Sequence, residues 1–327
     1  MTTTPIEIRR SHEDDLADVL ALLRQCLGWA DDARYAELFT WKHSANPFGA
    51  SPAWVALDGD RIVGLRILMR WEFERGGDVV RAVRAVDTAT HPDYRGHGVF
   101  TRLTRRAVEE LQSAGIGFVF NTPNDQSRPG YVNMGWRVVG RLPIAARPTS
   151  FVGGVRMLRA RAPAERWSAP AAAGSPAGDV LRQRDALERL LAARPRTDRL
   201  RTLVTPEFLA WRYASPLLDY RAMVAPAGLD HGVALFRVRR RGPAREAALC
   251  DVIVPGDDNR TRRAIVGSVI RAVDADYVVA IDPRPVTAAG LVRLPRQGPI
   301  LTWRELMPQA MPPRRAWDLR LGDIELF

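Results

Sequence analysis

The sequence predicts an α+β protein of two domains, each built on a mixed, mostly antiparallel sheet flanked by helices. Its 327 residues exceed the length at which a single hydrophobic core usually stops growing. Short apolar runs separated by glycine turns predict antiparallel strands, and longer runs with a period near 3.6 predict helices. The order of these elements in the first half recurs coarsely in the second half, which indicates two related domains.

The first half is predicted to contain a strand, two helices, three antiparallel strands, a β-α-β crossover and a last strand. Ser11 is a typical residue for the start of the first helix, and Asp58-Gly59 and Gly76-Gly77 are typical turns between strands. The crossover helix has an apolar stripe and is followed by Gly115, which is placed to end it. The predicted elements lie at residues 6–10, 12–23, 33–43, 53–73, 79–90, 99–114, 116–122 and 136–145, with a short helix or turn at 125–136.

A change in composition separates the two halves. Residues 160–178 are rich in alanine and proline and nearly lack strand-forming residues, which is typical of a linker. We therefore predict a first domain over residues 1–148, a linker over 149–178 and a second domain over 179–327. The second domain repeats the order of three strands followed by a β-α-β unit.

Composition limits the class of protein. A hydrophobic share of 46% and a charged share of 26% are those of a soluble globular protein. No segment reaches the roughly 18–20 apolar residues of a membrane span, and the first residues lack a signal or transit pattern. We expect a cytoplasmic protein without a membrane partner. Cys26 and Cys250 have no metal-like spacing, so we expect inert thiols and no metal site.

The formal net charge of +11 raises the question of nucleic-acid binding. Lys42 is the only lysine among 48 basic residues, and this imbalance suggests coding bias rather than selection for a polyanion. The arginines are scattered, and the single dense run, residues 237–245, is expected to be a solvated hairpin edge. We therefore expect no nucleic-acid partner.

A glycine-rich stretch, RGHGVF at residues 95–100, stands directly before the crossover helix. Such a turn exposes unpaired N–H groups at the positive end of the helix dipole, which suits a phosphate. The Walker pattern is absent, and a dinucleotide fingerprint would require glycine where Thr101 stands.

The stretch resembles instead the acyl-coenzyme A pyrophosphate loop of the GNAT acetyltransferase superfamily, written [Q/R]xxGx[G/A]. Arg95 and Gly98 match this pattern, whereas Phe100 departs from its last small residue. A second signature lies about 25 residues downstream, where this family has its coenzyme and acid residues. It consists of Asn124, Ser127, Tyr131 and Gly135-Trp136. The resemblance covers residues 1–148 and implies a GNAT fold there, with acetyl-CoA as the acyl donor.

The resemblance also implies which residues contact coenzyme A. The loop backbone would enclose the pyrophosphate, and the strand ending at Thr90 would run along the pantetheine arm. Alternatively, Asn124 is a turn residue, because asparagine is common in turns that follow a proline. The implied coenzyme-binding residues are Thr88, Ala89, Thr90, Arg95, Gly96, His97, Gly98, Val99, Phe100, Asn121, Asn124 and Ser127.

Acyl transfer to an amine needs a deprotonated nucleophile and a proton for the departing thiolate. Tyr131 lies where the family has its phenolic acid, and a phenol is protonated at neutral pH; the alternative is a tyrosine that only packs. Asp87 is a candidate general base on the strand facing the cleft, or a residue that pins the loop. The sequence leaves four other bases open, which are Glu72, Glu74, His43 and His97.

The acceptor is expected to bind near the first helical pair. Trp41, His43 and Trp71 are candidates for its pocket, although aromatic residues at such spacing also form cores. In the second half, Asp257 and Asp258 stand where a pyrophosphate turn would fall and would repel it. We therefore expect a degenerate GNAT-like domain that binds no coenzyme.

These observations predict an N-acetyltransferase that moves an acetyl or short acyl group from acyl-CoA to a primary amine of a small molecule. Transfer is expected to be direct and sequential, because no motif of a nucleophilic cysteine or serine is present. Two alternatives remain, a protein-lysine acetyltransferase and a non-catalytic acyl-CoA sensor. The sequence leaves open whether the protein is a monomer or a homodimer.

Overall fold

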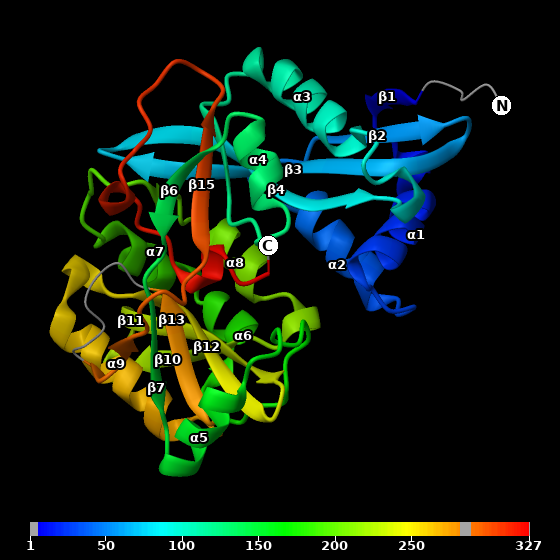
Figure 1. Ribbon diagram of the computed structural model, residues 1–327. Coiled ribbons are helices and arrows are strands. Elements are labelled where there is room, and N and C mark those ends of the chain that lie inside the picture. Colours follow the sequence, from blue (N-terminus) through cyan, green and yellow to red (C-terminus); the bar gives the residue numbers. More distant parts are fainter. Residues whose placement is uncertain (1–5, 282–288, 327) are drawn as a thin grey trace. The chain divides into compact units, whose positions relative to one another are not determined.

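A computed structural model describes residues 6–281 and 289–326 of the chain (Figure 1). The chain divides into two compact units, and each contains segments that are distant in sequence. Unit 1 consists of residues 1–73, 79–140 and 299–313. Unit 2 consists of residues 74–78, 141–298 and 314–327.

Unit 1 has a mixed sheet flanked by helices, as the sequence predicts. The strands lie in the order β1-β2-β3-β4-β5-β15-β6, and β4 and β5 form a parallel pair. The strands are β1 (Glu7–Arg10), β2 (Ala53–Asp58), β3 (Arg61–Arg75), β4 (Asp78–Thr90), β5 (Phe118–Asn121), β6 (Arg137–Arg141) and β15 (Ile300–Glu305). The helices are α1 (Leu16–Leu27), α2 (Arg34–His43), α3 (Val99–Gln112) and α4 (Arg128–Asn133), with short 3-10 turns η1 (Glu13–Asp15) and η2 (Pro92–Tyr94).

Helix α3 is the crossover between β4 and β5, and its predicted apolar stripe is buried against the sheet. Val99, Leu103 and Leu111 are at most 2% exposed. Gly64 on β3 allows the close approach, because a Cβ at this position would lie 2.6 Å from a methyl group of Val99. A parallel crossover carries the chain from the end of β4 back to the start of β5. This arrangement places the first turn of α3 just beyond the carboxyl end of β4.

Strand β15 comes from the end of the chain and completes the sheet of unit 1. It lies between β5 and β6, antiparallel to β5, with Thr302 opposite Asn121 (Figure 1). Trp303 on this strand is fully buried, and its ring centroid lies 6.3 Å from that of Phe118. The predicted continuous domain 1–148 therefore differs from the compact unit, which takes a strand from residues 300–305.

Unit 2 has a second mixed sheet in the order β14-β7-β13-β12-β11-β10-β8. The strands are β7 (Ile144–Pro148), β8 (Ser175–Pro176), β10 (Arg221–Ala225), β11 (Gly228–Arg241), β12 (Ala244–Ile253), β13 (Tyr277–Ile281) and β14 (Val292–Arg293). The helices are α5 (Phe151–Arg159), α6 (Ala177–Leu181), α7 (Arg184–Ala192), α8 (Pro206–Tyr213) and α9 (Asn259–Ala272). Shorter elements are β9 (Arg201–Thr202), η3 (Pro216–Leu218), η4 (Pro255–Asp257), η6 (Arg314–Ala316) and η7 (Leu321–Asp323).

The two sheets have the same topology. Strands β12 and β13 are parallel and joined through α9, as β4 and β5 are joined through α3. Strand β7 takes the place beside β13 that β15 takes beside β5 (Figure 1). This confirms an α+β fold and a second domain of the same design. The predicted boundary at residue 148 differs from the observed one, because β7 pairs within unit 2.

The predicted linker, residues 149–178, is largely folded into unit 2. Ser150 caps helix α5, because its side chain accepts a hydrogen bond from the Gly153 N–H. Ala169 and Ala173 are buried in the core of unit 2, and the Ala169 N–H donates to the carbonyl of Val238 at 2.8 Å. Ala169 and Ala173 therefore pack as small core side chains, although the composition of the segment resembles that of a linker.

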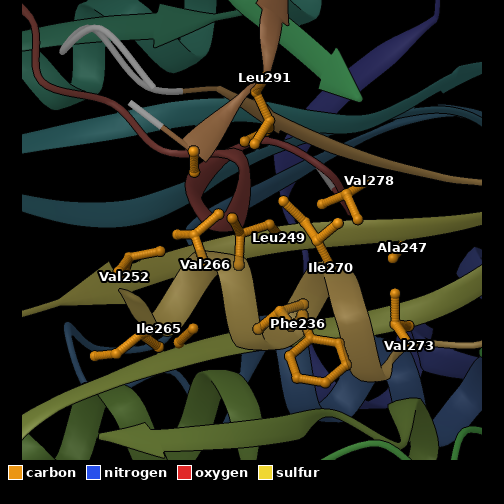
Figure 2. Close-up of a cluster of buried hydrophobic side chains, with 14 of the residues drawn as sticks. Phe236, Ala247, Leu249, Val252, Ile265, Val266, Ile270, Val273, Val278 and Leu291 are labelled. Carbon is orange, nitrogen blue, oxygen red and sulfur yellow. The ribbon is translucent and has the colours of Figure 1, made fainter. Parts of the chain in front are cut away.

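Helix α9 covers one face of the sheet of unit 2. Figure 2 shows Ile265, Val266 and Ile270 of this helix facing Phe236 and Leu249 of the strands. All five side chains are at most 8% exposed. The amphipathic pattern of the second β-α-β unit therefore forms a core in the same way as that of the first.

The dense arginine run is not the solvated edge that the sequence suggests. It forms the predicted hairpin between β11 and β12, but Arg237 and Arg239 are buried. Both donate to the carboxylate of Glu325, at 2.8 and 2.9 Å, and Arg239 also donates to Glu246. Buried arginines are retained where carboxylates pair with them, and here the carboxylate comes from the end of the chain.

Both cysteines have the environment expected of inert thiols. Each is free, and burial raises the pKa of both Cys26 and Cys250 above the usual thiol range. A raised thiol pKa reduces the fraction of reactive thiolate. Within residues 6–281 and 289–326, none of the helices combines the length and the apolar character that a membrane span requires.

Candidate active site

The glycine-rich loop forms an exposed turn between η2 and α3. Gly96 and Gly98 have φ values of 81° and 76°, in the left-handed region where glycine is favoured. Gly98 is the N-cap residue, and its carbonyl accepts from the Arg102 N–H at 2.9 Å. No side chain caps the helix at this position, so the N–H groups of its first turn lack an intrahelical acceptor.

The surroundings of this turn suit an anion. Residues 95–98 are exposed, and they include the side chains of Arg95 and His97. A Cβ on Gly96 or Gly98 would meet no protein atom within 4 Å, so both glycines face open space. Backbone N–H groups at the positive end of a helix dipole, beside a cationic side chain, form a ready site for phosphate.

Phe100 turns inward from the loop and reaches the candidate acid. Its ring is half-buried against the core of unit 1 and meets the ring of Tyr131 edge-on, with centroids 5.3 Å apart. A Cβ on Gly130 would lie 3.1 Å from the Phe100 ring, which makes glycine the residue that fits there. The large side chain of Phe100, which stands where the family pattern has a small residue, thus packs against Gly130 and Tyr131 of α4.

Tyr131 is buried, and its phenol accepts a hydrogen bond from a residue that the sequence analysis did not single out. The Arg66 Nη1 group donates to the phenol oxygen of Tyr131 at 2.7 Å and to the Thr88 hydroxyl at 2.6 Å. The side chains of Tyr131 and Arg66 are 4% and 0% exposed. The phenolic proton of Tyr131 remains available as a donor, because its oxygen acts as the acceptor in this contact.

The sequence contains a signal for the special position of Arg66. It is the only charged residue in the apolar stretch from Ile62 to Met69, in the middle of β3. A charged side chain in a strand that is buried on both faces needs a partner or a function.

The other predicted coenzyme residues are distributed along β4, β5 and the turn before α4. The side chain of Asn124 accepts from the Ser127 N–H and hydroxyl, both at 2.9 Å, as in the alternative reading of a turn residue. Asn121 accepts from the Thr302 hydroxyl at 2.5 Å, so part of its side chain supports β15. Ala89 is buried, and the Thr90 carbonyl accepts from the thiol of Cys26.

Asp87 lies in a cluster with two residues of α2, not with Tyr131. The Lys42 ammonium donates to Oδ2 of Asp87 at 2.6 Å, and Nε2 of His43 lies 2.9 Å from the same oxygen. Nδ1 of His43 lies 3.1 Å from the Ser51 hydroxyl. Asp87 has a φ of 42°, a left-handed conformation that is costly for a non-glycine residue and is held here by these contacts.

Ionisation in this cluster favours a structural role for Asp87. Burial alone would raise the pKa of the Asp87 carboxyl, but Lys42 and His43 outweigh it and hold the pKa far below its usual range. Burial also lowers the pKa of His43, against the effect of Asp87, so the imidazole is neutral at pH 7. Because ionised Asp87 only accepts, the proton lies on Nε2 of His43, and Nδ1 accepts from Ser51. A strongly acidic carboxyl that is ion-paired is a poor general base.

Replacing Asp87 by asparagine is expected to destabilise the protein by about 3 kcal/mol, because Lys42 would be left buried without a counter-ion. The measurement is the free energy of urea unfolding. The double variant Lys42→Met/Asp87→Asn should recover most of this loss. Equal losses in the single and double variants would contradict the pairing.

The same pair predicts how stability depends on pH. The folded pKa of Asp87 is depressed, so its contribution is fully present above about pH 4, the usual range of a free aspartate. The contribution is lost as the pH falls through the folded pKa.

Three further candidates have partners outside the region of Tyr131. Trp71 is fully buried between Phe48 and Phe120, at centroid distances of 5.9 and 6.2 Å, which agrees with the alternative of a core residue. Trp41 is 9% exposed and also belongs to the core. Glu74 accepts from Arg201 at 2.7 Å in unit 2.

The corresponding helix of unit 2 has a closed N-terminus. Asp258 caps α9, and its carboxylate accepts from the N–H groups of Arg260 and Thr261 at 3.0 and 2.9 Å. Asp257 accepts from Arg262 at 3.1 Å. The donors that α3 leaves open are thus filled in α9 by the protein's own carboxylate, as the aspartates in the sequence suggest.

Comparison with known proteins supports the identity of unit 1. The family profile "Acetyltransferase (GNAT) domain" matches residues 7–139, which include the glycine-rich loop and Tyr131. No curated protein matches the chain by sequence.

Several solved structures share the fold. A probable N-acyltransferase of unknown function from Enterococcus faecalis is 13% identical, with a TM-score of 0.63, over 93% of this chain and 73% of that one. GCN5-related N-acetyltransferases from Kribbella flavida and Anabaena variabilis are 15% and 12% identical, with TM-scores of 0.61 and 0.65. They cover 93% of this chain, and 71% and 73% of their own chains. Residues 7–139 thus match an acetyltransferase (GNAT) domain, and the solved structures that cover 93% of this chain share its fold.

Proposed function

We propose that unit 1 transfers an acetyl or other short acyl group from acyl-coenzyme A to a primary amine of a small molecule. The observation that carries this proposal is the first turn of α3, which no side chain caps and which follows two glycines with a left-handed backbone conformation. Phe100 belongs to the same turn, and its ring contacts the buried Tyr131. An anion site and a phenolic donor therefore belong to the same face of the sheet.

In this proposal the pyrophosphate of the coenzyme binds the N–H groups from Arg95 to Phe100. The pantetheine arm runs along the end of β4, where Thr88, Ala89 and Thr90 lie, as the family resemblance implies. The thioester then reaches Tyr131, whose phenolic proton is directed to the sulfur.

The reaction is a direct displacement. The amine nitrogen forms a bond to the thioester carbonyl carbon, and the carbon–sulfur bond breaks. Tyr131 supplies a proton to the departing thiolate, the nitrogen releases its proton to water, and water returns a proton to the phenolate. Sequential transfer is consistent with the cysteines, because Cys26 donates to the Thr90 carbonyl and Cys250 is buried in unit 2. The ion-paired state of Asp87 points to a role in holding α2 against β4 rather than in removing the proton of the amine.

The test is release of free coenzyme A from acetyl-CoA in the presence of different amines. Aminoglycosides, amino acids, polyamines, amino sugars and lysine peptides cover the acceptor classes. Turnover with a small amine supports the proposal, and turnover with peptides alone indicates a protein-lysine acetyltransferase. Tight coenzyme binding without turnover of any amine indicates an acyl-CoA sensor.

Substitution of Gly98 by alanine is expected to weaken coenzyme binding about tenfold or more, because a Cβ would occupy the space in front of the helix N-terminus. Gly115, after the other end of α3, provides a matched control. Its φ of 69° is similar, and a Cβ there also meets no atom within 4 Å.

Both alanine variants should lose about 1–2 kcal/mol of stability from the left-handed backbone. Calorimetry should show weakened coenzyme affinity in Gly98→Ala only. An equal loss of affinity in both variants would remove the loop from the binding site.

Unit 2 is proposed to bind no coenzyme, because the carboxylate of Asp258 already occupies the first turn of α9. We expect a stoichiometry of one coenzyme per chain in calorimetric titration. Two equivalent sites per chain would overturn this assignment.

A further inference from the structure

The guanidinium of Arg66 is fully buried in unit 1 and uses only part of its hydrogen-bonding capacity. Its Nη1 group donates to Thr88 and Tyr131. The Nε and Nη2 groups are buried, and neither has a hydrogen-bond partner within residues 6–281 and 289–326. In the same part of the chain, no carboxylate forms a salt bridge with Arg66.

The two unused donors lie on one edge of the guanidinium. In arginine, the N–H of Nε and one N–H of Nη2 are parallel, and together they match the two oxygens of a carboxylate. A neutral acceptor would leave one of the donors or the positive charge uncompensated, and a buried unpaired charge is strongly unfavourable. The Arg66 edge is therefore complementary to a planar anion.

The contacts of Arg66 place its guanidinium near the proposed position of the acyl donor. Arg66 lies beside Tyr131 and Phe100, with the guanidinium carbon 5.2 and 5.9 Å from their ring centroids. Phe100 belongs to the first turn of α3, where the pyrophosphate is proposed to bind. Asp87 instead contacts α2, so the ion-paired cluster and Arg66 serve different elements.

We propose that Arg66 selects an acyl group that carries a terminal carboxylate, so that the preferred donor is a short dicarboxylic acyl-coenzyme A. This inference rests on the proposed function, because it places the thioester beside Tyr131. The carboxylate binds the Nε–Nη2 edge while Nη1 remains bonded to the phenol. The acyl chain that joins the thioester to the carboxylate is short. The thioester lies beside Tyr131 and the carboxylate at the Nε–Nη2 edge, so only the guanidinium of Arg66 separates them.

The experiment compares two coenzyme A thioethers that cannot react, S-propyl-CoA and S-(2-carboxyethyl)-CoA, by calorimetry. The wild-type protein should bind the carboxylated compound about tenfold more tightly or better, as two charge-assisted hydrogen bonds would provide. In Arg66→Met this preference should vanish. In Arg66→Lys it should be reduced, because the charge is kept but the paired donors are lost. Arg105→Met, which removes an exposed arginine of α3, should keep the preference.

The outcomes separate this inference from the proposed function. If neither thioether nor coenzyme A binds the wild-type protein, the proposed function fails. If both thioethers bind with equal affinity, the coenzyme site stands and the role of Arg66 is overturned. Binding of S-propyl-CoA by each variant serves as the check on its folding. In turnover assays, succinyl-CoA should be used in preference to acetyl-CoA by the wild-type protein, and the ratio should fall in Arg66→Met.

Discussion

Residues 1–148, expressed alone, are expected to give an unfolded or aggregating fragment that binds no coenzyme. The sheet of unit 1 in the whole chain includes β15, and the fragment lacks it. Leu301, Thr302 and Trp303 of this strand are fully buried. Loss of a buried tryptophan costs about 3–5 kcal/mol by itself. This is a large part of the roughly 5–15 kcal/mol that stabilises a typical domain.

The fragment would also expose an apolar sheet edge. Strand β5, with Phe118 and Phe120 fully buried in the whole chain, would lose its antiparallel neighbour. Unpaired apolar edges promote association between molecules. Strand β7 is present in the fragment, but it offers Ala145 and Ala146 and cannot fill the volume of Leu301 and Trp303.

A matched control restores the missing strand. Residues 1–141 would be joined to residues 298–313 by a flexible linker of about four residues, a common length for a hairpin loop. The junction is short because Arg141 donates to the Gly298 carbonyl at 2.5 Å. Gel filtration, near-ultraviolet circular dichroism and thermal unfolding should show a cooperative monomer for the joined version only. A monomeric 1–148 fragment with a sharp unfolding transition would contradict the role of β15.

The variant Tyr131→Phe is expected to lower kcat about 100-fold or more while leaving coenzyme affinity nearly unchanged, as for removal of a general acid. The ring should stay in place, because it packs against Phe100 and Trp136 at centroid distances of 5.3 and 5.2 Å. Only the hydroxyl that accepts from Arg66 is lost, at a cost of about 1.5–3 kcal/mol in stability, because the donor is a charged group. The measurement is steady-state turnover with saturating acyl donor, together with the Kd for coenzyme A.

Tyr35→Phe is a suitable control for this variant. Tyr35 lies on α2 and stacks on Trp29 at 5.0 Å, so the same atom is removed from a tyrosine outside the proposed chemistry. Turnover of the control should match the wild type. Unchanged kcat in Tyr131→Phe would exclude this phenol as the proton donor.

Much of the donor site is predictable because it is local. The glycines before α3, the apolar stripe of α3 and the turn before α4 depend on residues a few positions apart, and all form as expected. Asp258 likewise acts within its own helix, where it caps α9. Such features follow from backbone conformation and from short-range hydrogen bonds, which the sequence shows directly.

The side-chain contacts within the candidate site join residues that are far apart in the sequence. Lys42 meets Asp87 across 45 positions, and Arg66 meets Tyr131 across 65. The periodicity of a strand does not predict which other strand pairs with it, because strand pairing depends on the packing of the whole sheet. For this reason the sequence leaves open whether Asp87 is a general base or a structural residue, and the ion pair with Lys42 is visible only in the folded protein.

The sequence by itself determined the helices, most strands, the open glycine turn and the position of the phenol, because each depends on short segments and on residue type. Tertiary structure alone decided that β15 completes the sheet of unit 1 and β7 that of unit 2, since strand pairing depends on the packing of the whole sheet. It also decided that Arg66 is buried with one edge unused. Only the folded sheet buries that guanidinium, and burial without a counter-ion is unfavourable for a charged group.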